Sequence, residues 1–312
     1  MASLKNIKLK ITSVKKTSTV TRAMEAVSAV KMRKSQERAL STRAYAAAAL
    51  SALERLSGSA DLARHPLMRP WESQAFPKRT ALIVVTSDKG LAGSLNSGVL
   101  KKAESELASR NLTSADTIVF AIGRRGAEYF ANRGYDVRQR HENVSDDVSE
   151  ADVRSVTDAL LAAHASGEVG AAVVVYQNFV STFEQAATVR QIVPLAAATM
   201  REFVEGIRPA KGKYAPLGTQ EPEAQAAAPY TIEPDAETVL SVLLPKLLNI
   251  AVFHALLENK ASEHSARMVA MKNATDNAKT KAKEYTRLFN KVRQAAITRE
   301  ISEITSGIEA MK

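Results

Sequence analysis

The fold is decided by the stretch KLLNIAVFHALLENKASEHSARMVAMKNATDNAKTKAKEYTRLFNKVRQAAITREISEITS, Lys246–Ser306, which contains neither glycine nor proline. Apolar or small residues recur in it at alternating spacings of four and three, the repeat of a helix that packs along another helix. At ~1.5 Å per residue the stretch would span about 90 Å, too far to fold back into a globule. We therefore expect a mechanical or structural role. The repeat consists of Leu243, Leu247, Ile250, His254, Leu257, Ala261, His264, Met268, Met271, Thr275, Ala278, Ala282, Tyr285, Phe289, Val292 and Ala296.

The N-terminal segment, residues 3–57, also has a helical pattern, and it is strongly basic. Residues 1–60 hold twelve Lys or Arg against three Glu, which gives this segment a net charge of +9. The simplest arrangement pairs it with the C-terminal helix as an antiparallel two-helix coiled coil. Its expected apolar stripe is Leu4, Ile7, Ile11, Val14, Val20, Met24 and Val27.

The middle of the chain has a different pattern. Short β-branched apolar runs at 80–87, 117–122 and 171–176, with a fourth candidate at 189–195, are typical of strands buried on both faces. Helical stretches lie between them. The alternation predicts a small α/β domain with a largely parallel, Rossmann-like sheet. The expected helices cover 96–109, 125–132 and 150–165.

Composition then suggests the domain boundaries. Residues 205–234 are rich in Gly, Pro and Ala and have no periodicity, so we expect a flexible linker or insertion. Asp235 is a plausible N-cap for the helix that follows. We expect an N-terminal helix at 1–60, an α/β domain at 61–204, the linker at 205–234 and a C-terminal helix at 235–312.

The C-terminal helix is longer than its partner and should extend past it. Beyond Ala296 the apolar stripe shifts by one residue, which turns it to another side of the helix. This predicts a tip that leaves the helix pair and enters a different apolar environment. The shifted stripe is Ile297, Ile301, Ile304, Ile308 and Met311.

Several classes of protein are disfavoured by composition. The chain has no cysteine, so disulfides and thiolate metal sites are excluded. It has no run of about 18 uncharged apolar residues, and we expect no transmembrane segment. The net charge of +10 indicates an acidic partner, which could be nucleic acid, anionic lipid or an acidic protein surface.

No catalytic, cofactor or metal site is expected. Thr86–Asn96 (TSDKGLAGSLN) follows a strand and opens a helix, where phosphate loops lie, but it matches neither GxxxxGK[ST] nor GxGxxG. We interpret this segment and Gly123–Gly126 as tight strand-to-helix turns. His254 and His264 are ten residues apart, whereas metal ligands on one helix face are three or four apart. We expect packing or a hydrogen bond for both.

Two other functions stay open from the residues alone. One is an α/β nucleotide-binding enzyme with helical arms, which would use the turn at 86–96 for a phosphate. The other is a basic coiled-coil scaffold for nucleic acid, which would require many phosphate contacts. Exposed aromatics and Gly-rich basic tracts, which RNA-binding proteins usually have, are missing.

Five motifs resemble one family. ASEHSARMVAMKNATDNA (Ala261–Ala278) closely resembles the signature of the gamma subunit of F-type ATP synthases. Ile7–Lys34 is similar to that family's N-terminal helix, and Thr86–Asn96 to its first strand and turn. Tyr230–Asp235 and Asn290–Gly307 match its late segments, so the resemblance covers nearly the whole chain in the right order.

The resemblance implies a central rotor shaft that makes no bond chemistry itself. Its coiled coil would stand inside a hexamer of three alpha and three beta subunits, with one copy per complex. Its base, with an epsilon subunit, would sit on the membrane ring of c subunits. Proton flow would turn ring and shaft, and the shaft would drive the catalytic sites on beta. The expected location is peripheral, on the cytoplasmic face of the bacterial inner membrane.

The resemblance also assigns contact residues by position. Arg293, Gln294 and Thr298 match the family's contacts with beta, and Met24 stands where the family has a coupling-sensitive residue facing beta. The c-ring contact is matched by Tyr230 and Glu233.

Overall fold

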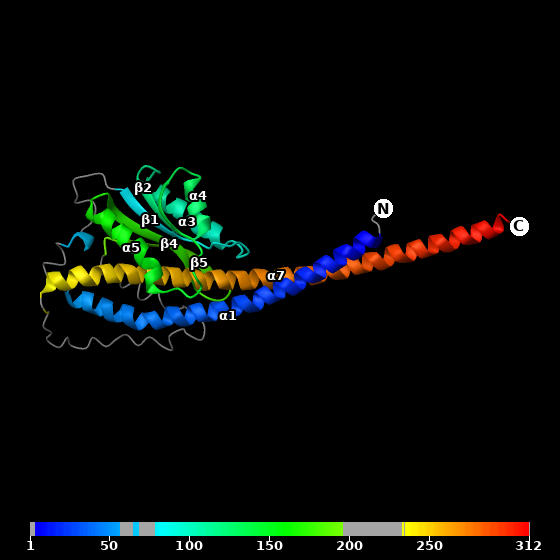
Figure 1. Cartoon of the computed structure of the whole chain (residues 1–312), viewed down its shortest axis with the longest axis horizontal. Coiled ribbons are helices and arrows are strands. Elements are labelled where there is room, and N and C mark those ends of the chain that lie inside the picture. Colours follow the sequence, from blue (N-terminus) through cyan, green and yellow to red (C-terminus); the bar gives the residue numbers. More distant parts are fainter. Residues whose placement is uncertain (1–3, 57–64, 69–78, 196–232, 234, 312) are drawn as a thin grey trace. The chain divides into compact units, whose positions relative to one another are not determined.

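The computed structural model describes residues 4–56, 65–68, 79–195, 233 and 235–311. The chain divides into two compact units, one of Met1–Ser28 with Arg267–Lys312 and the other of Ala29–Ala266. We call them the coil unit and the sheet unit. Two long helices, α1 (Leu4–Leu56) and α7 (Ala236–Glu309), each contribute to both (Figure 1). Of the expected linker at 205–234, Glu233 alone lies among the described residues.

The sheet unit contains a five-stranded sheet with the order β3-β2-β1-β4-β5. Strands β1 to β4 pair in parallel, and β5 runs antiparallel to β4. The expectation of a largely parallel sheet is therefore confirmed. The strands are β1 (Arg79–Val85), β2 (Thr117–Ile122), β3 (Asp136–His141), β4 (Val169–Phe179) and β5 (Gln185–Val193).

Strand β3 was not predicted from the sequence. It reads DVRQRH and carries four charged or titratable side chains, because it is an edge strand that pairs with β2 alone and is only half-buried. The search for apolar runs detects central strands, and the central β1 and β2 are buried along nearly their whole length. An edge strand with polar alternation gives no such signal.

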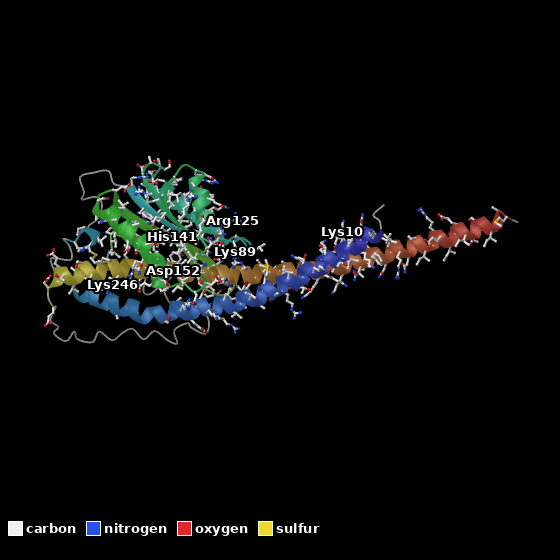
Figure 2. The ribbon with its side chains drawn as sticks, in the orientation of Figure 1. Lys10, Lys89, Arg125, His141, Asp152 and Lys246 are labelled. Atoms are coloured by element: carbon white, nitrogen blue, oxygen red, sulfur yellow. The ribbon has the colours of Figure 1, made fainter. Side chains whose placement is uncertain are left out.

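Three helices connect the parallel strands, within one residue of their expected bounds. They are α3 (Leu95–Ser109), α4 (Arg124–Ala131) and α5 (Glu150–Ala165). The start of α5 is fixed by Asp152, labelled in Figure 2, whose Oδ2 accepts a hydrogen bond of 2.6 Å from the Ser149 N–H. This hydrogen bond satisfies the backbone N–H of the residue before the helix, as in a capping box.

The two faces of the sheet bury separate apolar clusters. Helices α3 and α4 cover one face, where Leu82, Val119 and Val173 meet Phe130. Helices α5 and α7 cover the other face (Figure 1). Because both faces are covered, the central strands are apolar at successive positions rather than at alternate ones.

The α7 helix has an unusually apolar first third. Among the described residues it is the one helix long and apolar enough to cross a membrane, with an 18-residue window of mean hydropathy 1.8. That window is 61% buried inside the fold, and the core helix of a globular domain passes the same test. Leu240, Leu244 and Leu247 are fully buried in the cluster shared with β1 and α5. The apolarity of this segment therefore serves the sheet unit.

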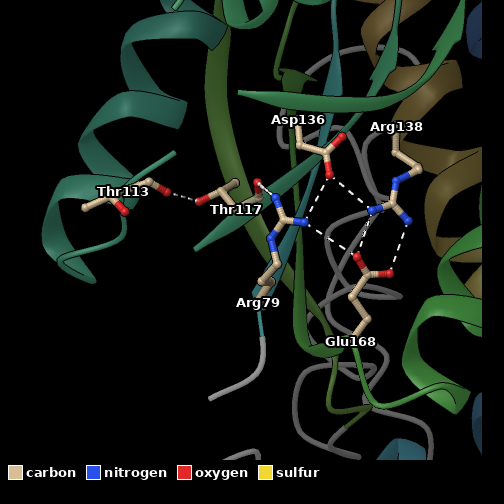
Figure 3. A network of polar contacts seen from close by, with 6 residues as sticks. All are labelled: Arg79, Thr113, Thr117, Asp136, Arg138 and Glu168. Carbon is tan, nitrogen blue, oxygen red and sulfur yellow. Dashed lines mark hydrogen bonds and ion pairs between the residues drawn. The ribbon is translucent and has the colours of Figure 1, made fainter. Parts of the chain in front are cut away.

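A network of four charged side chains joins the amino ends of the strands (Figure 3). Asp136 Oδ2 lies 3.0 Å from Arg79 Nη1 and 3.1 Å from Arg138 Nη2, and Arg138 also holds Glu168 at 2.7 Å. Arg79 donates to the Thr117 carbonyl at 3.0 Å. Hydrogen bonding from Arg138 lowers the pKa of Glu168. The network fixes the edge strand β3 to the turn before β4.

At the opposite ends of the strands, the turn after β2 closes tightly on the end of β1. Gly123 has φ +101°, and a Cβ there would lie 2.1 Å from the Thr86 carbonyl oxygen. The Thr86 hydroxyl in turn accepts a hydrogen bond of 2.8 Å from the Gly126 N–H. Only glycine has both the conformation and the space that position 123 requires.

We expect Gly123→Ala to destabilise the sheet unit by about 2–4 kcal/mol, because the new methyl meets backbone and the φ is unfavourable. Gly134→Ala is the matched control, since its φ is +76° but the space around it is open. That control should cost only about 1 kcal/mol. Urea unfolding of both variants, followed by circular dichroism, measures the difference, and equal costs would contradict this account of the turn.

Candidate functional site

In the coil unit, α1 and α7 meet along a slim seam. Thr21 and Thr275 face each other across it with their hydroxyl oxygens 2.6 Å apart, and Thr275 is only 2% exposed. Met271 and Ala278, one turn to either side on α7, are also buried. The repeat read from the sequence of α7 is therefore confirmed here. The small side chains of Thr21, Thr275 and Ala278 let the two helices approach closely.

The stripe expected on α1 was partly wrong. Val20 and Val27 are 58% and 54% exposed, and the seam is formed at those levels by Ser18, Thr21 and Ser28. Along α1, the alternating spacing of four and three residues continues through these serine and threonine side chains. Hydrophobicity alone favoured the neighbouring valines. Inside the seam, the Thr21 hydroxyl donates to the Thr17 carbonyl at 3.0 Å, and that of Ser28 donates to the Met24 carbonyl at 2.7 Å.

The contact residues suggested by resemblance lie in different surroundings. Met24 is half-buried at the side of the seam, whereas Arg293 and Gln294 are exposed. Thr298 is exposed too, and its hydroxyl donates to the Gln294 carbonyl at 3.0 Å. Glu233 is exposed, and Tyr230 lies outside the described residues.

The C-terminal part of α7 continues past the first turn of α1. Lys10, labelled in Figure 2, has its Nζ 5.9 Å from the centre of the Tyr285 ring. With Thr21 opposite Thr275, this fixes an antiparallel pairing, so Leu4 at the start of α1 lies opposite about residue 291. Every residue from Ile297 to Met311 is exposed, including the whole shifted stripe. Within the coil unit, the last turns of α7 therefore extend beyond the start of α1.

A basic groove of about 740 Å³ runs between the helices of the coil unit. Its lining consists of small side chains and of four cationic ones. Lys279 pairs with Asp276 at 3.3 Å, but no acidic partner is seen among the described residues for the other three cations. The lining residues are Lys15, Ser18, Thr19, Lys279, Ala282, Lys283, Thr286 and Arg287. Such a surface favours anionic groups of a partner.

In the sheet unit, polar side chains of α7 reach the backbone at the end of β4. Glu258 Oε2 accepts from the Phe179 N–H at 2.8 Å, and Asn259 Oδ1 accepts from the Gln177 N–H at 3.2 Å. The Ser262 hydroxyl donates to the Gln177 carbonyl at 3.0 Å. All three α7 side chains are buried. These contacts with the backbone of β4 were not predicted from the sequence.

Burial dominates the protonation of the neighbouring pair His254 and Glu258. It lowers the pKa of His254 to about 3 and raises the pKa of Glu258 to about 7. His254 Nε2 lies 3.6 Å from Glu258 Oε1, and at neutral pH the imidazole carries no charge. The described residues contain no group of three metal-ligating side chains, and His254 belongs to the core.

The other expected histidine belongs to a cluster around Asp146, in the loop between β3 and α5. Asp146 Oδ2 lies 2.6 Å from Lys31 Nζ of α1, and Oδ1 lies 3.0 Å from His264 Nε2 and 3.8 Å from Lys260 Nζ of α7. Lys260 also donates to the Val144 carbonyl at 2.8 Å. One carboxylate thus links two helices through this loop.

Partial burial disfavours the charged form of Asp146 and by itself would raise the pKa of its carboxyl group. The hydrogen bond from Lys31 and the charges of His264 and Lys260 outweigh this effect, so the pKa of Asp146 is lowered. A carboxylate whose pKa is lowered by folding stabilises the fold above its ordinary pKa.

The turn at 86–96 has its polar groups engaged within the fold. The Ser87 N–H and hydroxyl both bond to Asn96 Oδ1, at 3.0 and 3.1 Å, and Asp88 Oδ1 accepts from the Arg124 N–H at 2.9 Å. Lys89 and Arg125 project from the same end of the sheet (Figure 2). This arrangement supports the interpretation as a tight structural turn, because its groups are already paired.

Comparison with known proteins gives consistent matches over the full length. The family model described as ATP synthase matches residues 3–311. The ATP synthase gamma chain of Pelotomaculum thermopropionicum is 36% identical and that of Cupriavidus necator is 38% identical, each over the whole of both chains.

Solved structures share the fold. A chain of the Euglena gracilis mitochondrial ATP synthase, in its OSCP/F1/c-ring assembly, aligns with TM-score 0.62 and 16% identity over 99% of this chain and 94% of that chain. A chain of the Tetrahymena thermophila mitochondrial ATP synthase central stalk and c-ring aligns with TM-score 0.56 and 22% identity, over 82% and 99%. At these identities the likeness concerns the fold alone.

We expect Asp146→Asn to lower the thermal midpoint of the protein at pH 7, by an amount equivalent to about 1 kcal/mol once solvent screening is allowed for. The loss should shrink as the pH falls below about 3.9, the ordinary pKa of an aspartate, because the native carboxyl then becomes protonated as well.

The matched control is Asp158→Asn, on the exposed face of α5. Calorimetry of both variants between pH 7 and pH 3 measures the effect. A midpoint difference that is the same at every pH, or equally large for Asp158→Asn, would show that the charge of Asp146 contributes nothing.

Proposed function

The chain belongs to the ATP synthase gamma-chain family, whose members are non-catalytic subunits of the central stalk, and from this premise we propose that it is the rotor shaft of a proton-driven ATP synthase. In this role it carries out no bond chemistry. It turns with the ring of c subunits and, through its asymmetric coil, changes the affinity of the three beta sites for ADP, phosphate and ATP. The coil acts inside the hexamer of alpha and beta subunits.

The overhanging end of α7 carries most of this proposal. Four isoleucines and a methionine on that end are 48–89% exposed in the isolated chain. A row of exposed large apolar side chains on one helix indicates a surface that a partner covers. An apolar sleeve at the centre of the alpha and beta hexamer would cover it and still allow rotation, since apolar packing is not directional.

The cationic surface of the coil unit supports the contacts with beta. The basic groove offers charges to acidic loops of a partner, and exposed ion pairs are worth only about 0–1 kcal/mol each. Such contacts can be made and broken during each turn. We assign Met24, Arg293, Gln294 and Thr298 to contacts with beta.

Glu233 is exposed just before the start of α7, at the opposite end of that helix from the overhang. We assign Glu233 and Tyr230 to the contact with the polar loops of the c ring. An epsilon subunit is proposed to share this base. The complex contains one copy of this chain with three alpha and three beta subunits, and it lies peripherally on the cytoplasmic face of a bacterial inner membrane.

Co-purification tests the proposal directly. An affinity-tagged chain expressed in its own cell should bring down alpha and beta subunits in one complex with ATPase activity. A tagged chain that is folded, abundant and always isolated without an ATPase would overturn the assignment. Calorimetry with ATP then addresses the enzyme alternative, since a shaft should bind no nucleotide by itself.

The overhang makes a graded prediction. Deleting residues 304–312 should weaken ATP-driven proton pumping per ATP hydrolysed, because it removes part of the apolar stripe. Deleting residues 297–312 should weaken pumping further, because it removes the whole stripe. Glu303→Gln is the control, since it changes only an exposed charge on that segment. Quenching of a pH-sensitive dye in membrane vesicles gives the ratio, and undiminished pumping after the longer deletion would contradict the role of the overhang.

Met24 makes a second prediction. Met24→Lys should uncouple hydrolysis from pumping, because it places a charge at a half-buried position beside the seam and next to beta. Met24→Leu, which keeps an apolar side chain of similar volume, should leave coupling intact. If Met24→Lys enzyme pumps as well as the parent at equal ATPase rates, Met24 has been misassigned.

A further inference from the structure

The contact between α7 and the sheet changes character along the helix. From Leu240 to Leu257 it is mainly apolar, with the leucines of α7 buried in one cluster with β1, β2, β4 and α5, and the buried polar exceptions are Asn249 and His254. From Glu258 onward the residues that face the sheet are polar although they remain buried. Buried polar side chains are costly unless each has a partner. Their partners show what this segment does.

The partners are backbone groups of β4 that have no neighbouring strand. The last parallel pair between β1 and β4 is Val84 with Val175, but β4 continues to Phe179. On its other edge β4 stays paired with β5 up to Phe179 and Gln185. Beyond Val175, the edge of β4 that faced β1 therefore lacks a strand, and its N–H and C=O groups must be satisfied in another way.

Side chains of α7 occupy the place of the missing strand. Glu258 and Asn259 accept from the N–H groups of Phe179 and Gln177, and the Ser262 hydroxyl donates to the Gln177 carbonyl. One turn further along, the Ser265 hydroxyl donates to the Thr182 carbonyl at 2.5 Å, in the turn between β4 and β5. These four α7 residues lie on one helix face, since their spacing follows the helical repeat. We call them the polar joint.

The two kinds of contact resist different movements. Apolar packing is not directional, so the leucine segment alone would tolerate a small rotation or slide of α7 over the sheet. A hydrogen bond weakens steeply when its donor and acceptor are displaced or misaligned. Four such bonds to a rigid strand and its turn therefore fix both the axial position and the rotation of α7 relative to the sheet.

We propose that the polar joint, Glu258, Asn259, Ser262 and Ser265, is the torque-bearing connection through which rotation of the α/β domain is passed to the long helix α7. This inference rests on the proposed function as a rotor shaft. The four side chains are positioning residues: they touch no nucleotide and act by holding α7 in one orientation. The α/β domain and the segment of α7 that lies on it then turn together, with no slip between them.

The choice of residues supports a role in position rather than in stability. Buried polar groups commonly give specificity of register, and apolar replacements of similar volume are often equally stable. Ser262 and Asn259 are completely buried, where leucine or alanine would satisfy a core. Burial also raises the pKa of Glu258 to about 7, so an uncharged carboxamide should be tolerated at this position.

The test compares three variants in the assembled complex. The joint variant, Glu258→Leu with Ser262→Ala, removes two of the hydrogen bonds. The conservative variant, Glu258→Gln, keeps an acceptor for the Phe179 N–H. The matched control, Glu106→Leu with Ser109→Ala, makes the same chemical changes on α3, where Ser109 is exposed and the half-buried Glu106 pairs with Arg110 at 2.6 Å rather than with the backbone of β4. ATP-driven proton pumping and ATPase rate are measured in the same membrane vesicles.

In the joint variant, we expect the rate at which the α/β domain slips relative to α7 to rise on the order of tenfold for each hydrogen bond lost. Pumping per ATP then falls while ATPase activity persists. The conservative variant and the control should both pump like the parent. The proposal is overturned if the joint variant pumps as well as the parent, or if the conservative variant loses coupling to the same extent. Assembly of the parent complex tests the proposed function separately, so the two failures are distinguishable.

Hydrogen exchange decides whether the effect is local, and it applies even if the joint variant assembles poorly. Exchange at the Phe179 amide should accelerate in Glu258→Leu, and exchange at the Gln177 amide should accelerate in Asn259→Leu, because these side chains accept from those N–H groups. The amides of β1 should keep the parent rate. Unchanged exchange at both amides would show that the bonds to α7 do not hold the end of β4, and would refute the joint. Acceleration across the whole sheet would count equally against it, because the bonds would then serve stability.

Discussion

A helix of 74 residues requires a neighbour for its apolar side along most of its length, and this constraint organises the molecule. In the sheet unit α7 lies on the sheet, first through leucines and then through polar side chains that bond to β4. In the coil unit its neighbour is α1, across a seam slim enough for Thr21 and Thr275 to touch. Only its last segment, from Ile297, has no neighbour within the chain, among the residues that the structure describes. That exception gives the clearest indication of a partner.

The distribution of charge is consistent with the same division of roles. Within the sheet unit, two groups of charged side chains pair with one another, in the network of Figure 3 and in the cluster around Asp146. In the coil unit, the cations around the groove face outward. A domain that must remain rigid has its charges satisfied internally, whereas a surface that meets a succession of partners keeps them exposed.

Much of this architecture could be predicted from the sequence, for physical reasons that are specific to each element. The long repeat of α7 and the buried runs of β1, β2 and β4 are strong periodic or apolar signals. Strand β3 gave none, because an edge strand carries polar side chains. Val20 and Val27 were placed in the seam because hydrophobicity was weighted above the exact spacing, and the seam takes serine and threonine instead. The partners of Glu258 and Asp146 depend on where a strand ends and a loop returns, which no local pattern encodes. The contact residues Met24, Arg293, Gln294, Thr298, Tyr230 and Glu233 come from family resemblance and remain predictions.

The central claim is the antiparallel pairing of α1 and α7 in a single register. The chain has no native cysteine, so engineered pairs can measure it cleanly. Thr21→Cys with Thr275→Cys should form a disulfide rapidly and nearly completely under mild oxidation, because the two hydroxyls are 2.6 Å apart. Thr21→Cys with Ala282→Cys is offset by about 10 Å along the helix and should not cross-link. Efficient cross-linking of the offset pair, or none of the Thr21–Thr275 pair, would contradict the account.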